Sequence, residues 1–242
     1  METPESLTRF DGGPAVEPDF ANLYEAFLAT VARKGDETAI VSEDEGVEMT
    51  WNQLDRRVRA LAGGLNACGI GRGDTVGMLL GPRADFIPVD LAAVSIGAVP
   101  FSIYQTLSAE QIEYVGKDSG ARLIVTEQAL LPELLEARHR LPALEVVVVI
   151  DGQGGDMTMD ELVGADPDFD PISEASPVGL GDPLTLIYTS GTTGPPKGVL
   201  LTQGNLMSML STVMHQVLEI PDQGGRLISW LPAAHIAERA AN

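Results

Sequence analysis

The sequence predicts an α/β fold in which mostly parallel sheets are flanked by helices. Short apolar runs of strand length recur along the chain, and amphipathic stretches with helical spacing separate them. The run Glu145–Ile150, with four valines at its centre, has the continuous apolar character of a strand that is buried on both faces. Strands that alternate with helices at this spacing form parallel or mostly parallel sheets.

The clearest predicted helix follows Thr50. The stretch T-W-N-Q, from Thr50 to Gln53, is a capping box in which the hydroxyl serves as N-cap and the glutamine reaches back from the third helical position. Apolar residues then recur every three or four positions, which places them on one helix face, namely Leu54, Val58, Leu61, Leu65 and Cys68. Gly69 supplies the stop.

The other elements follow the same two patterns, and a second capping box, Ser108–Gln111, begins a helix that contains Ile112 and Val115. The further predicted strands are Val76–Leu80, Val99–Ile103, Leu123–Thr126, Leu184–Tyr188 and Arg226–Leu231. The further predicted helices are Ala84–Ile96, a short one near Thr158–Val163, and one marked by Leu206, Leu210, Val213 and Val217.

Charge and composition exclude several classes of protein. The 242 residues carry 15 Lys and Arg against 35 Asp and Glu, a formal charge of −20, which argues against non-specific nucleic-acid binding. No apolar run has the length of a transmembrane segment, and the polar, acidic start METPESLTRFDGG does not resemble a signal peptide. A single cysteine, Cys68, forms no internal disulfide, so we expect a cytoplasmic protein, with peripheral membrane association as the alternative.

The segment 151–182 differs in composition from the rest of the chain. It holds nine acidic residues, frequent Gly and Pro, and no Lys or Arg. Because it shows no calcium-loop spacing, we predict a solvated connection and no metal site. The predicted organisation is an N-terminal arm at 1–19, a first α/β subdomain at 20–150, this connection, and the start of a second subdomain at 183–242.

Chemistry is concentrated in Tyr188–Gly198, which reads YTSGTTGPPKG. Its three glycines allow the backbone to approach a ligand closely, and successive N–H groups can form an anion-binding nest. Lys197 supplies a positive charge, and four hydroxyls add donors, from Thr189, Ser190, Thr192 and Thr193. The stretch is not a Walker A loop, because Pro196 precedes the lysine and Gly198 follows it. We predict a loop that binds the phosphates of a nucleotide.

This stretch resembles the signature of the adenylate-forming (AMP-binding) superfamily, which includes acyl-CoA synthetases, peptide-synthetase adenylation domains and luciferases. TWNQLDRRVRALAGGL, from Thr50, is similar to the early helix of the family, and the segment from Val76 to Glu127 is similar to its next strand–helix–strand unit. WLPAAHIAER, from Trp230 to Arg239, resembles a motif that reads LPLAHxxER in long-chain fatty acyl-CoA synthetases. The likeness covers about residues 20–242.

The resemblance implies an incomplete N-terminal adenylation domain with two interlaced subdomains and no C-terminal domain. It further implies that the loop wraps the β- and γ-phosphates of ATP, through Thr189, Ser190, Gly191, Thr192, Thr193 and Gly194, while Lys197 compensates their charge. His235 would be the catalytic residue beside the acyl carboxylate, with a helix-cap or core histidine as the alternative. ATP with Mg²⁺ would be the nucleotide, and the fatty acid and CoA would be the other substrates.

The family also has later motifs that this sequence does not contain, among them the lysine used in adenylation. The only lysines here are Lys34, Lys117 and Lys197. We therefore expect the chain to be inactive in fatty acid–CoA ligation by itself. The alternatives are a non-enzymatic remnant, one half of a split enzyme with a complementing C-terminal fragment, and part of a fatty acyl-AMP ligase that loads a carrier protein.

Overall fold

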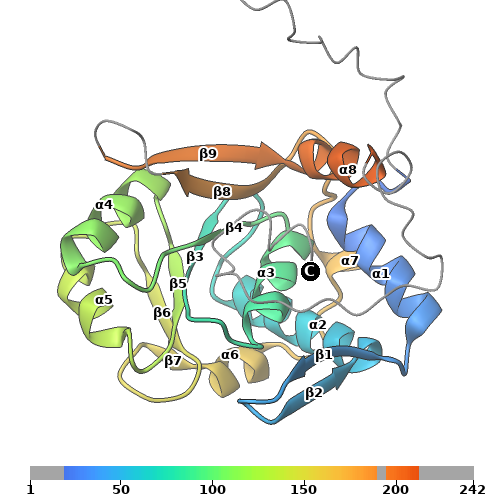
Figure 1. Cartoon of the computed structure of the whole chain (residues 1–242), viewed down its shortest axis with the longest axis horizontal. Coiled ribbons are helices and arrows are strands. Elements are labelled where there is room, and N and C mark those ends of the chain that lie inside the picture. The colour runs from blue at the N-terminus through green and yellow to red at the C-terminus, as the bar shows by residue number, and fades with distance from the viewer. Residues whose placement is uncertain (1–18, 190–194, 213–242) are drawn as a thin grey trace, which may run out of the picture.

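A seven-stranded sheet organises the part of the chain that the computed structural model describes, residues 19–189 and 195–212 (Figure 1). In spatial order its strands are β7 (Met157–Thr158), β6 (Val146–Val149), β5 (Leu123–Thr126), β3 (Thr75–Leu79), β4 (Val99–Ser102), β8 (Pro183–Thr189) and β9 (Lys197–Thr202). Every neighbouring pair is parallel except β8 with β9, which is antiparallel. The mostly parallel α/β fold is therefore confirmed.

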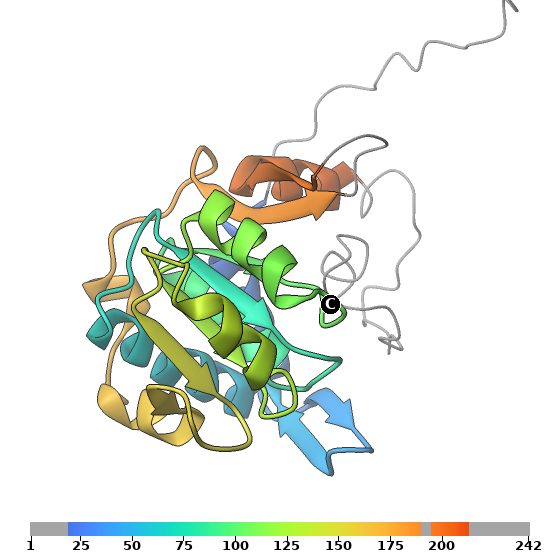
Figure 2. The ribbon, with the colours of Figure 1, turned by 90° about the vertical axis from the view of Figure 1, so that its left-hand side faces the viewer.

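Helices cover both faces of this sheet, and the view in Figure 2 shows the sheet between them. One face is covered by α1 (Leu23–Lys34), α2 (Trp51–Ala67), α3 (Phe86–Ser95) and α6 (Met159–Ala165). The other is covered by α4 (Ala109–Ser119) and α5 (Leu131–Arg138). Two further helices, α7 (Pro171–Glu174) and α8 (Gln203–Thr212), lie in the later part of the described chain.

Alternation along the central strands divides the core into two apolar clusters. In β5, Leu123 and Val125 belong to the cluster on the α2 side, whereas Ile124 belongs to the cluster on the α4 side. Val148 of β6 faces the first cluster, and Val147 faces the second. Since successive side chains of a strand point to opposite faces, a strand between two helix layers must be apolar throughout.

Both predicted capping boxes are present. Thr50 accepts a hydrogen bond from the amide of Gln53 and begins α2, and Ser108 does the same for α4. Gly69 follows α2 with a φ of 76°, a conformation that favours glycine. The third box, Thr158 with Glu161, begins α6 in the place where a short helix was predicted.

The sequence reasoning missed a small antiparallel hairpin, β1 (Thr38–Ser42) with β2 (Val47–Thr50), as well as helices α1 and α5 and strand β9. No residue of β1 or β2 is buried, and the longest apolar run in either strand is the three residues Ala39–Val41, so the apolar signal is shorter than in the central strands. The predicted strand Arg226–Leu231 and the end of the last predicted helix lie outside the described residues.

Close contact between α2 and α6 depends on two adjacent glycines of α2. A Cβ atom on Gly63 would lie 2.0 Å from the carbonyl oxygen of Asp166, and one on Gly64 would lie 2.1 Å from that of Leu162. Any side chain at these positions would push the two backbones apart.

The acidic segment 151–182 contains β7, α6 and α7, and it contacts the preceding part of the chain through ion pairs. Four of its carboxylates pair with arginines, in the pairs Asp151–Arg83, Asp156–Arg138, Asp170–Arg59 and Asp182–Arg72. These ion pairs hold the segment against the rest of the fold, so it is more than a solvated connection. The subdomain boundaries proposed from the sequence remain a prediction.

Among residues 19–189 and 195–212, no helix combines the length and apolar character needed to cross a membrane.

Candidate functional site

The two described ends of the predicted phosphate-binding stretch lie at the carboxyl edge of the large sheet. Because β8 is parallel to β4, its end at Thr189 lies at the same edge as the ends of β3, β4, β5 and β6. This is the edge at which open α/β sheets bind their ligands. Figure 1 shows β8 and β9 along the top of the molecule, beside α4.

Two of the predicted phosphate-binding residues face each other across the β8–β9 hairpin. Thr189, the last residue of β8, is the cross-strand partner of Lys197, the first residue of β9, and both are exposed. The sequence predicted one continuous loop over Tyr188–Gly198, whereas the structure takes both ends of that stretch into the hairpin. The described chain therefore presents a threonine and a lysine at the two ends of the connecting loop.

The remaining predicted site residues lie outside the described residues, namely Ser190, Gly191, Thr192, Thr193, Gly194 and His235. Their assignments remain predictions.

Lys197 differs from the other two lysines in its surroundings. Lys34 pairs with Glu37 at 3.3 Å, and Lys117 pairs with Glu113 at 2.6 Å. Within residues 19–189 and 195–212, Lys197 has no carboxylate partner. In a chain of charge −20, an exposed ammonium group without such a partner is available to an external anion.

Gly198 is explained by its neighbour across the hairpin. A Cβ atom there would lie 3.0 Å from Leu186 Cδ1 and 3.3 Å from Tyr188 Cζ. The absence of a side chain lets the tyrosine ring lie against β9, so this glycine serves hairpin packing as well as the ligand approach that the sequence suggested.

Contacts from α4 hold both ends of the loop. Tyr188 Oη donates a hydrogen bond to Asp118 Oδ2 at 2.8 Å, and Tyr114 Oη donates one to the carbonyl oxygen of Pro196 at 3.0 Å. Burial, and secondly the hydrogen bond to Asp118, raise the pKa of Tyr188, so its phenol stays protonated and remains a donor. The sequence reasoning missed Tyr114 and Asp118, for which the only signal is their spacing of four on the amphipathic helix α4.

A second group of charges lies at the same sheet edge, between the ends of β3 and β5. Arg83 is 2.7 Å from a carboxylate oxygen of Glu45 and 3.1 Å from those of Glu127 and Asp151. The amide of Gly81 also donates to Glu127, whose side chain is almost fully buried. We call these four side chains the Arg83 cluster, in which all three carboxylates are paired with the one guanidinium group.

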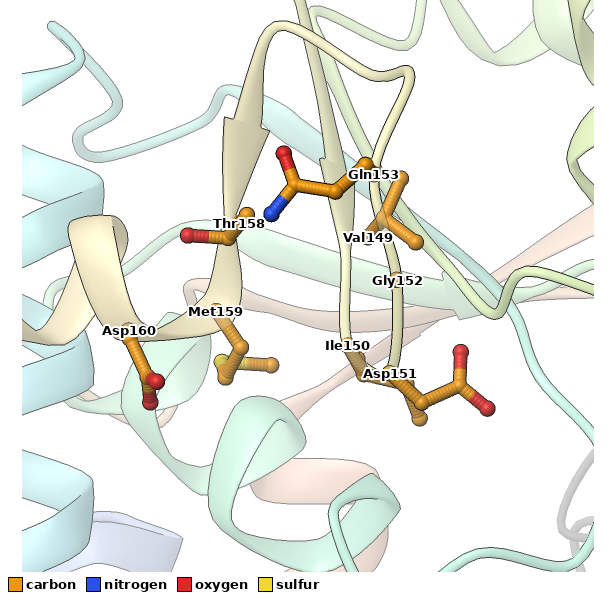
Figure 3. Close-up of a pocket in the computed structure, with 8 residues that line it drawn as sticks. All are labelled: Val149, Ile150, Asp151, Gly152, Gln153, Thr158, Met159 and Asp160. Atoms are coloured by element: carbon orange, nitrogen blue, oxygen red, sulfur yellow. The ribbon is translucent and has the colours of Figure 1, made fainter.

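A cavity of about 360 Å³ lies near the β7 edge of the sheet, opposite the edge formed by the β8–β9 hairpin (Figure 3). Its lining comes from the end of β6 with the following turn, residues 149–153, and from the β7–α6 junction, residues 158–160. Since β5, β3 and β4 separate β6 from β8, this cavity is not part of the phosphate-binding stretch.

No group of three or more His, Cys, Asp or Glu side chains in the described ranges is arranged to hold a metal ion. The described side chains at the two ends of the predicted phosphate loop are the hydroxyl of Thr189 and the ammonium group of Lys197, and Mg²⁺ prefers carboxylate and phosphate oxygens. The described residues thus fit an anion better than a bare metal ion.

Comparison with known proteins gives a consistent result. Residues 27–242 match the model of a family described as AMP-binding enzyme. The long-chain-fatty-acid–CoA ligase FadD15 of Mycobacterium bovis is 36% identical over 197 residues, which is 80% of this chain and 33% of that protein. The chain thus spans about a third of the length of the long-chain-fatty-acid–CoA ligases it matches.

Solved structures agree on the fold. A putative long-chain-fatty-acid CoA ligase from Rhodopseudomonas palustris matches with a TM-score of 0.79 and 25% identity, over 91% of this chain and 53% of that one. The ligase FadD1 from Archaeoglobus fulgidus matches with a TM-score of 0.82 and 24% identity, over 95% of this chain and 46% of that one, which supports the fold alone.

Proposed function

The chain belongs to the AMP-binding enzyme family, and from this we propose that it supplies the ATP-phosphate-binding part of a fatty acid–CoA ligase. The observation that carries the proposal is the pairing of Thr189 with Lys197 at the carboxyl edge of the sheet. A hydroxyl donor and an ammonium group without an ion pair in the described chain flank a glycine-rich loop. This arrangement suits the β- and γ-phosphates of ATP.

In the proposed reaction a fatty-acid carboxylate oxygen attacks the α-phosphorus of ATP. The bond to the pyrophosphate leaving group breaks, and acyl-AMP and pyrophosphate form. The thiol of CoA then attacks the acyl carbon, giving the thioester and AMP. We assign to Lys197 the compensation of phosphate charge as the pyrophosphate departs.

The other assignments belong to the same proposal. Thr189, Ser190, Gly191, Thr192, Thr193 and Gly194 donate hydrogen bonds to the phosphates, and His235 lies beside the acyl carboxylate. Mg²⁺ arrives bound to the phosphates of ATP, where it offsets their charge. The choice of a long-chain fatty acid and of CoA is supported by the names of the relatives, which are long-chain-fatty-acid–CoA ligases.

Calorimetric titration of the 242-residue chain with MgATP tests the phosphate site. We expect saturable binding that Lys197→Ala weakens by about tenfold to a hundredfold, because a charge-assisted hydrogen bond contributes about 1.5–3 kcal/mol. Lys34→Ala is the matched control, since this lysine is the last residue of α1 and is paired with Glu37. Equal affinities for the wild type and both variants would contradict the assignment of Lys197.

A second measurement concerns the complete reaction. We expect palmitate-dependent exchange between ATP and pyrophosphate to stay near background for these 242 residues, because none of the three lysines is a counterpart of the family's later adenylation lysine. Robust exchange would show that this expectation is wrong. Restoration of exchange by an added C-terminal fragment of a related ligase would support the split-enzyme alternative.

A further inference from the structure

The tip of the β8–β9 hairpin extends beyond the support of the main sheet. The bridge between β4 and β8 is limited to Phe101 with Leu186, so the residues of β8 that lead into the loop pair only with β9. The first four residues of β9 are exposed. The β8–β9 pairing sets the separation of Thr189 from Lys197, but β4 does not hold this pair, so its position relative to the rest of the sheet depends on other contacts.

Helix α4 provides that support on both sides of the loop. Tyr188, directly before Thr189, donates to Asp118 at 2.8 Å, and the carbonyl of Pro196, directly before Lys197, accepts from Tyr114 at 3.0 Å. Tyr114 and Asp118 are four residues apart, hence on one face of the helix. Both views place α4 beside the hairpin (Figure 1 and Figure 2).

Packing fixes the Tyr188 side of this contact more firmly than the Tyr114 side. The Tyr188 side chain is only 7% exposed, and its ring centroid is 6.0 Å from that of Phe101. Tyr114 is 36% exposed, so its ring contributes little to the core and its hydroxyl is the part that reaches the loop. Removing that hydroxyl should therefore release the backbone at Pro196 and leave the fold intact.

We propose that Tyr114 and Asp118 are positioning residues, which hold the two ends of the phosphate loop against α4 and so fix where the Thr189–Lys197 pair lies relative to the main sheet. The inference rests on the proposed binding of ATP phosphates by this hairpin. Both residues act on the ligand through the backbone and through Tyr188. Neither is a catalytic residue.

Hydrogen–deuterium exchange of the nucleotide-free 242-residue chain tests the contact itself. Tyr114→Phe should speed amide exchange over residues 197–199, which follow the two prolines, by about threefold to tenfold, the effect of losing one hydrogen bond. Tyr24→Phe is the matched control, because it removes a hydroxyl on α1 that contacts no part of the hairpin. Asp118→Ala should speed exchange as well, whereas Asp118→Asn retains an acceptor for Tyr188 and should behave as the wild type.

Titration with MgATP and with tripolyphosphate tests the positioning role. Both affinities should fall by the same factor of about three to ten in Tyr114→Phe, at an unchanged melting temperature, because the contact acts on the phosphates and not on adenosine. Unchanged exchange in both Tyr114→Phe and Asp118→Ala would overturn the proposal. Faster exchange with unchanged affinities would overturn the positioning role.

If the wild type binds neither ATP nor tripolyphosphate, the proposed function fails while the exchange data still decide whether α4 holds the hairpin. The two failures are therefore distinguishable.

Discussion

Replacing Gly64 by alanine should destabilise the fold, although glycine-to-alanine changes inside helices ordinarily stabilise. An alanine in a helix interior gains about 1 kcal/mol over glycine. Here the new Cβ would lie 2.1 Å from the Leu162 carbonyl oxygen, against 3.4–4 Å for an ordinary contact, so α2 and α6 must move apart before an ordinary contact is restored. Overpacking of this kind costs about 1–3 kcal/mol, and contact with backbone places it at the upper end.

The expected net change is a loss of about 1–2 kcal/mol in the free energy of unfolding. Equilibrium unfolding in urea, followed by circular dichroism, measures this loss. An unchanged slope of the unfolding free energy against urea concentration shows that the variant and the wild type expose the same surface on unfolding. Gly164→Ala is the matched control on α6, because a Cβ there meets no atom within 4 Å, and it should gain up to about 1 kcal/mol. If Gly64→Ala were as stable as Gly164→Ala, the close backbone contact between α2 and α6 would be refuted.

Two further predictions concern single polar groups. Tyr24→Phe should raise the free energy of unfolding by up to about 1 kcal/mol, since the Tyr24 hydroxyl is buried with no hydrogen-bond partner among the described residues; a loss in urea unfolding would contradict this. The pKa of Asp182 is lowered from its ordinary 3.8, first by the hydrogen bond from the Gly179 amide and then by Arg72. The charged Asp182 carboxylate therefore stabilises the fold fully above about pH 4, and this stabilisation is lost as the pH falls through the lowered pKa. The stability difference between wild type and Asp182→Asn, measured from pH 6 to pH 3, should therefore narrow below pH 4, and a constant difference would exclude the contribution of the Asp182 charge.

Elements with a strong local signal were predictable from the sequence. The helix after Thr50 has its capping box, its apolar face and its terminal glycine within twenty residues, and the structure contains all three. The central strands were predictable because burial on both faces requires an apolar residue at every position, as in Val146–Val149.

Other elements depend on neighbours that are distant in the sequence. Strand β9 is exposed along most of its length and is defined by its hydrogen bonds to β8, which periodicity does not report. Within the candidate site, the glycine-rich stretch was predictable because its chemistry is contiguous. Its supports were not, because Tyr114 is 82 residues from Pro196 and Asp118 is 70 residues from Tyr188.

The Arg83 cluster bears on where an anion can bind at the sheet edge. Three carboxylates surround one guanidinium group, so the cluster keeps an excess of two negative charges. It lies at the crevice between β3 and β5, where the strand order reverses and where many α/β proteins bind phosphate groups. Under the proposed function, a triphosphate that approaches this edge would be repelled from the crevice and attracted toward Lys197. The same acidic composition that opposes nucleotide binding over the whole surface would thus confine the proposed binding to the end of the β8–β9 hairpin.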